Sequence, residues 1–139
     1  MEAERNGAAV RRAVEAIWNG GALDAADALF APEYVNHGGL IPDLVRGPEA
    51  IKVSAALYRT AFPDLHVVVD DLVADGETVV LRWTARAAPP GAIPPGPQGE
   101  VTGVTRGRVV GGRIAESWTS WDRAGTLARL GLIPPAGAV

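Results

Sequence analysis

Two glycine turns constrain the fold of this chain more than any other feature of its sequence. Asp75-Gly76 and Gly111-Gly112 each lie between segments rich in β-branched and aromatic residues. Short Asp-Gly and Gly-Gly connections between such segments are typical of β-hairpins. The sequence therefore predicts a four-stranded antiparallel run built from two consecutive hairpins. The four predicted strands cover residues 65–73, 78–87, 101–110 and 113–121.

Helical patterns come before these strands. Residues 8–19 carry one apolar stripe at helical spacing, which Gly20-Gly21 ends. Gly47-Pro48 begins a later helix that reaches position 62, because proline suits the first helical turn. Helices followed by strands indicate an α+β domain rather than alternating α/β units. Further predictions are a helix at 22–30, a short extended piece at 34–37, a proline-rich loop at 88–99 and a last helix at 123–130.

Length and composition narrow the functional classes. The 139 residues fit one domain, 1–139, and nearly half are apolar, which is enough for a core. Cysteine is absent, and the net charge of -3 comes without a basic block, so nucleic-acid binding has little support. No apolar run approaches membrane-spanning length, so no membrane partner and a cytoplasmic location are expected. Two distant histidines, His37 and His66, predict no metal site.

Four stretches together are similar to one known family. They are AIWNGGALDAADALFAPEYVNH, RGPEAIK, TAFPDLHVVVDDLVADGETVVLRW and GGRIAESWTSWDRAGTLARLG, in that order. In order and spacing the chain resembles the SnoaL-like polyketide cyclases. The resemblance implies the cone-shaped fold of nuclear transport factor 2, in which a curved antiparallel sheet wraps around N-terminal helices and encloses a pocket. It also implies a small hydrophobic substrate, no cofactor and a homodimer.

The resemblance also shows where the chain departs from its family. The family's cyclases use an aspartate on the last strand, which falls on Thr119, and two histidines, which fall on Ser117 and Thr105. A threonine hydroxyl does not usefully ionise near neutral pH, so it cannot replace a general base. It can still position a carbonyl group or a water molecule. Ordinary strand threonines are the alternative, because threonine favours strands.

A related group, the limonene-type epoxide hydrolases, matches at other positions. The resemblance carries its Tyr-x-Asn pair onto Tyr34 and Asn36 and its arginine onto Arg82, whereas its acids fall on Thr84 and Thr119. Tyr34 and Asn36 have the spacing of one strand face, although a core tyrosine beside a turn-forming asparagine is an equal alternative.

The register of the last hairpin decides which side chains share a face. A two-residue turn at Gly111-Gly112 would pair Thr105 with Trp118. A three-residue connection with a glycine bulge would pair Thr105 with Ser117, and the family resemblance favours this register. On that register Ser117, Thr119 and Trp121 line the pocket.

Other side chains are candidates for the pocket wall, each with a structural alternative. Alternation places His37 away from Tyr34 and Asn36, and Arg82 belongs either to the cavity or to a solvated strand face with Trp83 in the core. Aromatic residues in this set are equally consistent with a core or a dimer interface, for which Trp83 and Trp118 are the candidates. The predicted substrate-binding residues are Trp18, Tyr58, Phe62, Thr84, Thr105, Trp121 and His37.

The functional hypothesis is a cofactor-independent cyclase of secondary metabolism acting on a polyketide-like substrate. Tyr34 and Asn36 would donate hydrogen bonds, Thr119 and Ser117 would position the substrate, and Arg82 would stabilise an anion. A pericyclic or directed ring closure suits such a site, because holding the reacting ends together supplies much of the rate. The alternatives are an epoxide hydrolase or hydratase, a protein that assists hydroxylation, and a non-catalytic ligand-binding domain.

Overall fold

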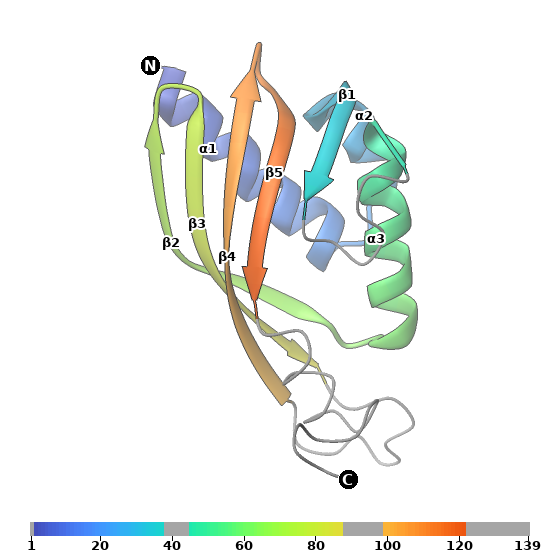
Figure 1. Cartoon of the computed structure of the whole chain (residues 1–139). Coiled ribbons are helices and arrows are strands. Elements are labelled where there is room, and N and C mark those ends of the chain that lie inside the picture. The colour runs from blue at the N-terminus through green and yellow to red at the C-terminus, as the bar shows by residue number, and fades with distance from the viewer. Residues whose placement is uncertain (1, 38–44, 88–98, 122–139) are drawn as a thin grey trace, which may run out of the picture.

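The computed structural model describes residues 2–37, 45–87 and 99–121, with the side chain of Trp121 left aside. Helices and one strand come first and four further strands follow, as expected for an α+β domain (Figure 1). The helical elements are α1 (Glu2–Ala13), the π-helix η1 (Val14–Asn19), the 3₁₀ helix η2 (Leu23–Ala25), α2 (Ala26–Leu29) and α3 (Pro48–Ala61). The strands are β1 (Phe30–His37), β2 (His66–Asp75), β3 (Thr78–Ala87), β4 (Gly99–Val110) and β5 (Arg113–Trp121).

The strands form one curved sheet in the order β1-β5-β4-β3-β2. The two predicted hairpins are confirmed, and all neighbours among β2 to β5 are antiparallel. β1 pairs with β5 in parallel. The sequence predicted only a short extended piece at 34–37 and did not predict this pairing. The register of β1 shifts between Phe30 and Val35, around Pro32. An edge strand tolerates this proline because one side of its backbone needs no partner.

The helices all lie on one face of the sheet (Figure 1). We call this the inner face, and the opposite one the outer face. The core forms between the helices and the inner face, where Ile17 and Val79 are fully buried. Exposed valines mark the outer face instead: Val68, Val73, Val80, Val104 and Val110. No helix in the described ranges is long and apolar enough to cross a membrane.

Element boundaries differ from the sequence prediction in places. The first helix begins at Glu2, and its final turn and a half widens into the π-helix η1. The helix expected at 22–30 is reduced to η2 and α2, because Phe30 already has extended backbone and belongs to β1. The helix expected at 123–130, and the loop expected at 88–99 apart from Gly99, lie outside the described residues.

Candidate functional site

The β4–β5 hairpin has a register that neither sequence alternative contained. Gly111-Gly112 makes a two-residue turn with Val110 opposite Arg113, but the pairing then passes over Ala115. As a result Thr105 lies opposite Thr119, so the predicted pairing with Ser117 is wrong by two residues. A shift of two residues keeps every side chain on its face. The prediction that Thr105, Ser117 and Thr119 share one face is therefore confirmed.

A first polar cluster joins β1 to β5 on the inner face. The Tyr34 hydroxyl lies 2.6 Å from Ser117 Oγ, and Ser117 Oγ donates to Asn36 Oδ1 over 3.4 Å. The parallel register places Asn36 directly opposite Ser117, which brings these groups together. Tyr34 is 1% exposed and packs edge-on against Phe30. Its hydroxyl group is therefore hydrogen-bonded to Ser117 and shielded from solvent.

Burial has a measurable consequence for Tyr34. Loss of solvation raises the pKa of Tyr34 to about 12, and the hydrogen bond with Ser117 only partly opposes this. Tyrosines of the unfolded chain ionise near pH 10. The contribution of Tyr34 to the free energy of unfolding is therefore fully present below pH 10 and is lost as the pH rises towards 12. The shift corresponds to about 3 kcal/mol of unfolding free energy. Denaturant unfolding of wild type and Tyr34→Phe between pH 9 and 12 measures it.

The variant separates this effect from the titration of other groups. Tyr34→Phe lacks the buried phenol, so its stability should decline less over the same pH range than that of wild type. Equal losses in both proteins would contradict a raised pKa at Tyr34.

A second polar cluster joins β3, β4 and β5 on the same face. The indole Nε1–H of Trp83 donates to Thr105 Oγ1 over 2.9 Å, and Thr105 Oγ1 lies 2.9 Å from Thr119 Oγ1. All three side chains are partly buried. Sequence reasoning treated Trp83 as a pocket-wall, core or interface residue and missed this polar contact. Alternation did offer a signal, since it places Trp83 and not Arg82 on the apolar side of β3.

The inner face carries hydroxyl and amide groups without charge. Its polar residues in the described ranges include Tyr34, Asn36, Thr105, Ser117 and Thr119, and none of them ionises near neutral pH. Hydroxyl pairs of this kind donate and accept hydrogen bonds but do not abstract protons. The arrangement suits a neutral ligand with carbonyl or hydroxyl oxygens.

Two predicted site residues on β3 lie on the wrong face. Arg82 is exposed on the outer face, between Asp71 on β2 and Val104 on β4, so the prediction that it stabilises an anion in the cavity is wrong. Thr84 also points outward and donates to Asp70 Oδ2 over 2.5 Å, which removes it from the pocket wall. The physical reason is that the apolar side of β3 packs against the helices and leaves the other side to polar residues.

His37 belongs to the outer face as well, so its prediction as a pocket residue is wrong and strict alternation was right. Its ring lies 2.7 Å from Glu116 Oε2 and stacks on Trp118 with a centroid separation of 5.4 Å. Arg106 lies over the same indole at 4.2 Å. Hydrogen bonding to His37, and then to Arg108, lowers the pKa of Glu116.

Three of the four remaining predicted wall residues lie at the α3 side of the core. Trp18 on η1 and Tyr58 on α3 contact each other at 5.7 Å between ring centroids, and Phe62 is buried just after α3. Trp121 is a β5 residue opposite Gly103, and its side chain is not among the described groups. Their contact with a substrate stays a prediction, as does the expectation that a second copy covers part of the outer face.

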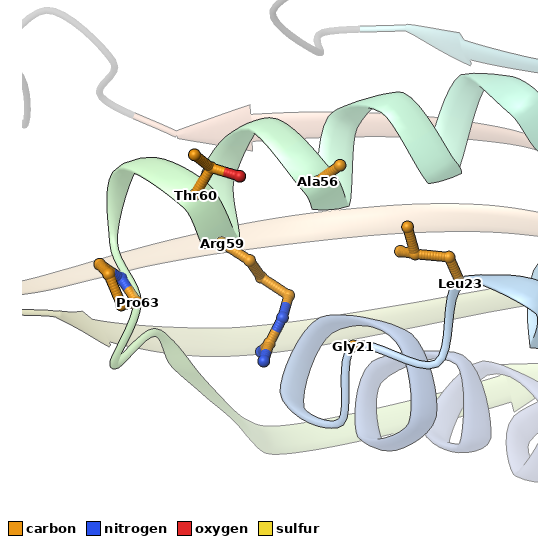
Figure 2. A pocket seen from close by; sticks show the side chains of 6 residues that line it. All are labelled: Gly21, Leu23, Ala56, Arg59, Thr60 and Pro63. Carbon is orange, nitrogen blue, oxygen red and sulfur yellow. The ribbon is translucent and has the colours of Figure 1, made fainter.

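A separate hollow lies on the surface between α3 and the end of η1 (Figure 2). The Arg59 guanidinium there donates to the carbonyl oxygens of Trp18 and Asn19 over 2.7 and 3.0 Å. A cation at the carboxyl end of a helix satisfies carbonyl groups that lack partners and opposes the helix dipole. Arg59 therefore has a structural role. The hollow encloses about 340 Å³ and is lined by Gly21, Leu23, Ala56, Arg59, Thr60 and Pro63.

Comparison with known proteins gives a family and a fold. The sequence model of the family described as SnoaL-like polyketide cyclase matches residues 8–130. A comparison with the curated proteins finds no match.

Solved structures extend this similarity over almost the whole chain. IdmH from Streptomyces antibioticus, provisionally named a polyketide cyclase, is 31% identical with a TM-score of 0.77, covering 91% of this chain and 98% of that one. A provisionally named polyketide cyclase from Acidithiobacillus ferrooxidans is 26% identical with a TM-score of 0.79, covering 91% and 94%. A Catenulispora acidiphila protein described as having a ketosteroid isomerase-like fold is 24% identical with a TM-score of 0.73, covering 90% and 93%. The expected cone-shaped fold is therefore confirmed.

Proposed function

Because the chain belongs to the SnoaL-like polyketide cyclase family, we propose that it is a cofactor-independent enzyme of secondary metabolism that closes a ring in a polyketide-like substrate. We assign the rate enhancement to positioning and hydrogen bonding rather than to proton abstraction. The substrate is a neutral, largely apolar molecule that carries carbonyl oxygens.

One observation carries this proposal. Two hydrogen-bonded hydroxyl pairs, Tyr34 with Ser117 and Thr105 with Thr119, lie on the inner face. The family resemblance matches the aspartate of the cyclases to Thr119 and their histidines to Ser117 and Thr105. Hydroxyl groups cannot accept a proton as carboxylates do, so an aldol step that depends on an enzyme base is disfavoured.

Ring closure is possible without such a base. In a pericyclic closure the electrons rearrange within the substrate, and no proton leaves it. The enzyme then contributes by holding the reacting ends in contact. This lowers the activation barrier, because the entropy of bringing the ends together is lost on binding rather than in the reaction step. A hydrogen bond from the inner face to a substrate carbonyl further polarises the reacting system.

Mass spectrometry tests the reaction class. Purified protein is incubated with extract of a producer strain that lacks it, and heat-denatured protein serves as the control. We expect a product with the same mass as its precursor but a different chromatographic retention time, as ring closure by isomerisation requires.

Other mass changes would overturn the cyclase assignment. A gain of water would indicate hydration or epoxide hydrolysis, and a gain of oxygen would indicate hydroxylation. Retention of one compound by the protein, with no new chromatographic peak, would indicate a binding protein.

A further inference from the structure

The indole of Trp83 is fixed by a glycine on the neighbouring strand. Trp83 lies opposite Gly103, and a Cβ atom added to Gly103 would come within 2.3 Å of Cζ2 and 2.7 Å of Cε2 of the indole. The ring therefore lies directly over the glycine backbone. Any side chain at position 103 would push the ring aside and move its nitrogen away from Thr105.

The hydrogen bond that this geometry produces has a direction. An indole N–H only donates, so it must occupy one acceptor position on Thr105 Oγ1, 2.9 Å away. Thr105 still has one proton to donate, and Thr119 Oγ1 lies 2.9 Å from it. When Thr105 donates to Thr119, the three groups form a chain with all donors aligned, and such chains strengthen each member.

We propose that Trp83 is a positioning residue that makes Thr119 the hydrogen-bond donor to a carbonyl oxygen of the ligand. With the Thr105 proton directed to Thr119 Oγ1, the Thr119 proton is the one directed into the site. This inference rests on the proposed function, because it requires a neutral carbonyl compound on the inner face. In this arrangement the hydrogen-bond chain from Trp83 through Thr105 polarises the hydroxyl group of Thr119.

The other cluster has a different character. Ser117 is 7% exposed and already contacts both Tyr34 and Asn36. Thr119 is more exposed and contacts Thr105. Of these two β5 hydroxyls, Thr119 is therefore the one better placed to meet a ligand.

The Trp83 indole resonance tests the hydrogen bond itself. In ¹H–¹⁵N spectra the Nε1–H signal of Trp83 is identified by its loss in Trp83→Phe. Thr105→Val removes the acceptor and should move this signal upfield. Thr102→Val is the matched control, because Thr102 is an exposed threonine on the outer face of the same strand. An unmoved indole signal in Thr105→Val would overturn the inference without affecting the proposed function.

Binding of a neutral aromatic ketone, 2-acetylnaphthalene, tests the donor role. Trp83→Phe and Thr119→Val should each weaken binding by about three- to tenfold, the range of one hydrogen bond. The double variant should bind as weakly as Thr119→Val alone, because Trp83 acts through Thr119. The infrared carbonyl stretch of the bound ketone should shift to higher frequency in all three variants.

The outcomes separate the two proposals. Losses that multiply in the double variant would show that Trp83 acts by packing alone, and would overturn the inference. Failure of wild-type protein to bind the ketone would overturn the proposed ligand class and the donor role with it. The carboxylate 2-naphthoate has the same ring system and should bind at least tenfold more weakly, since the inner face offers no cation among its described residues.

Discussion

Replacing Gly47 with alanine is expected to lower the free energy of unfolding by about 3 kcal/mol and the melting temperature by about 10 °C. Gly47 has φ 76° and ψ -167°, a backbone region that is essentially restricted to glycine. A Cβ atom there would lie 2.5 Å from the carbonyl oxygen of Pro32. Because the obstacle is backbone, no side-chain rotation relieves it. Calorimetry and urea unfolding measure the two quantities.

Gly76 provides the matched control. It also has a positive φ, 57°, but a Cβ atom there would meet nothing within 4 Å. Gly76→Ala should therefore cost only the conformational strain, about 1 kcal/mol. Similar losses in the two variants would show that the contact with Pro32 is relieved without cost.

The consequence of Gly47→Ala reaches the candidate site. The Gly47 N–H donates to the carbonyl oxygen of Tyr34 over 2.8 Å and so links the start of α3 to β1. Displacing this link moves the strand that presents Tyr34 and Asn36 to β5. Activity should consequently fall in Gly47→Ala even at temperatures where the variant is folded.

The sequence predicts the hairpins well because turn chemistry is local. Asp75-Gly76 and Gly111-Gly112 mark turns by residue type alone. The addition of β1 beside β5 has no local signal, because it depends on contacts between segments about 80 residues apart. Ala115 illustrates the same limit. It has no partner in the pairing of β4 with β5, and its residue type does not predict this irregularity.

The placement of Arg82 was decidable in principle. Alternation divides β3 into two faces, and one of them carries only apolar residues: Val79, Leu81, Trp83, Ala85 and Ala87. A face of this composition packs against the core, so Arg82 had to point away from it. The resemblance to epoxide hydrolases implied the opposite position for Arg82, in the cavity. For Thr119 the structure shows a place on the inner face beside Thr105, whereas its contact with a substrate stays a prediction, since composition alone does not separate a pocket threonine from an ordinary strand threonine.

Removing both hydroxyl groups from the inner face of β5 is expected to have the largest effect on activity. The double variant Ser117→Ala/Thr119→Val should lower kcat/KM about 100-fold, because it removes the Thr119 hydrogen bond to the transition state and the Ser117 contacts that hold Tyr34 and Asn36, at about 1.4 kcal/mol each. Substrate affinity should change much less, since the apolar walls are intact. Steady-state kinetics on the substrate found by mass spectrometry measures both quantities.

Two companion variants make this result interpretable. Thr102→Val/Ser120→Ala makes the same chemical changes on the outer face, at one residue of β4 and one of β5, and it should retain wild-type kinetics. Ser117→Thr/Thr119→Ser exchanges the two residues but keeps both hydroxyls, and it should recover most of the activity. If Ser117→Ala/Thr119→Val stays folded and fully active, hydrogen bonding from β5 does not contribute to catalysis. If Ser117→Ala/Thr119→Val keeps the wild-type kcat and the whole loss lies in substrate affinity, the two hydroxyls stabilise substrate and transition state equally, and the site is a binding pocket rather than a catalytic one.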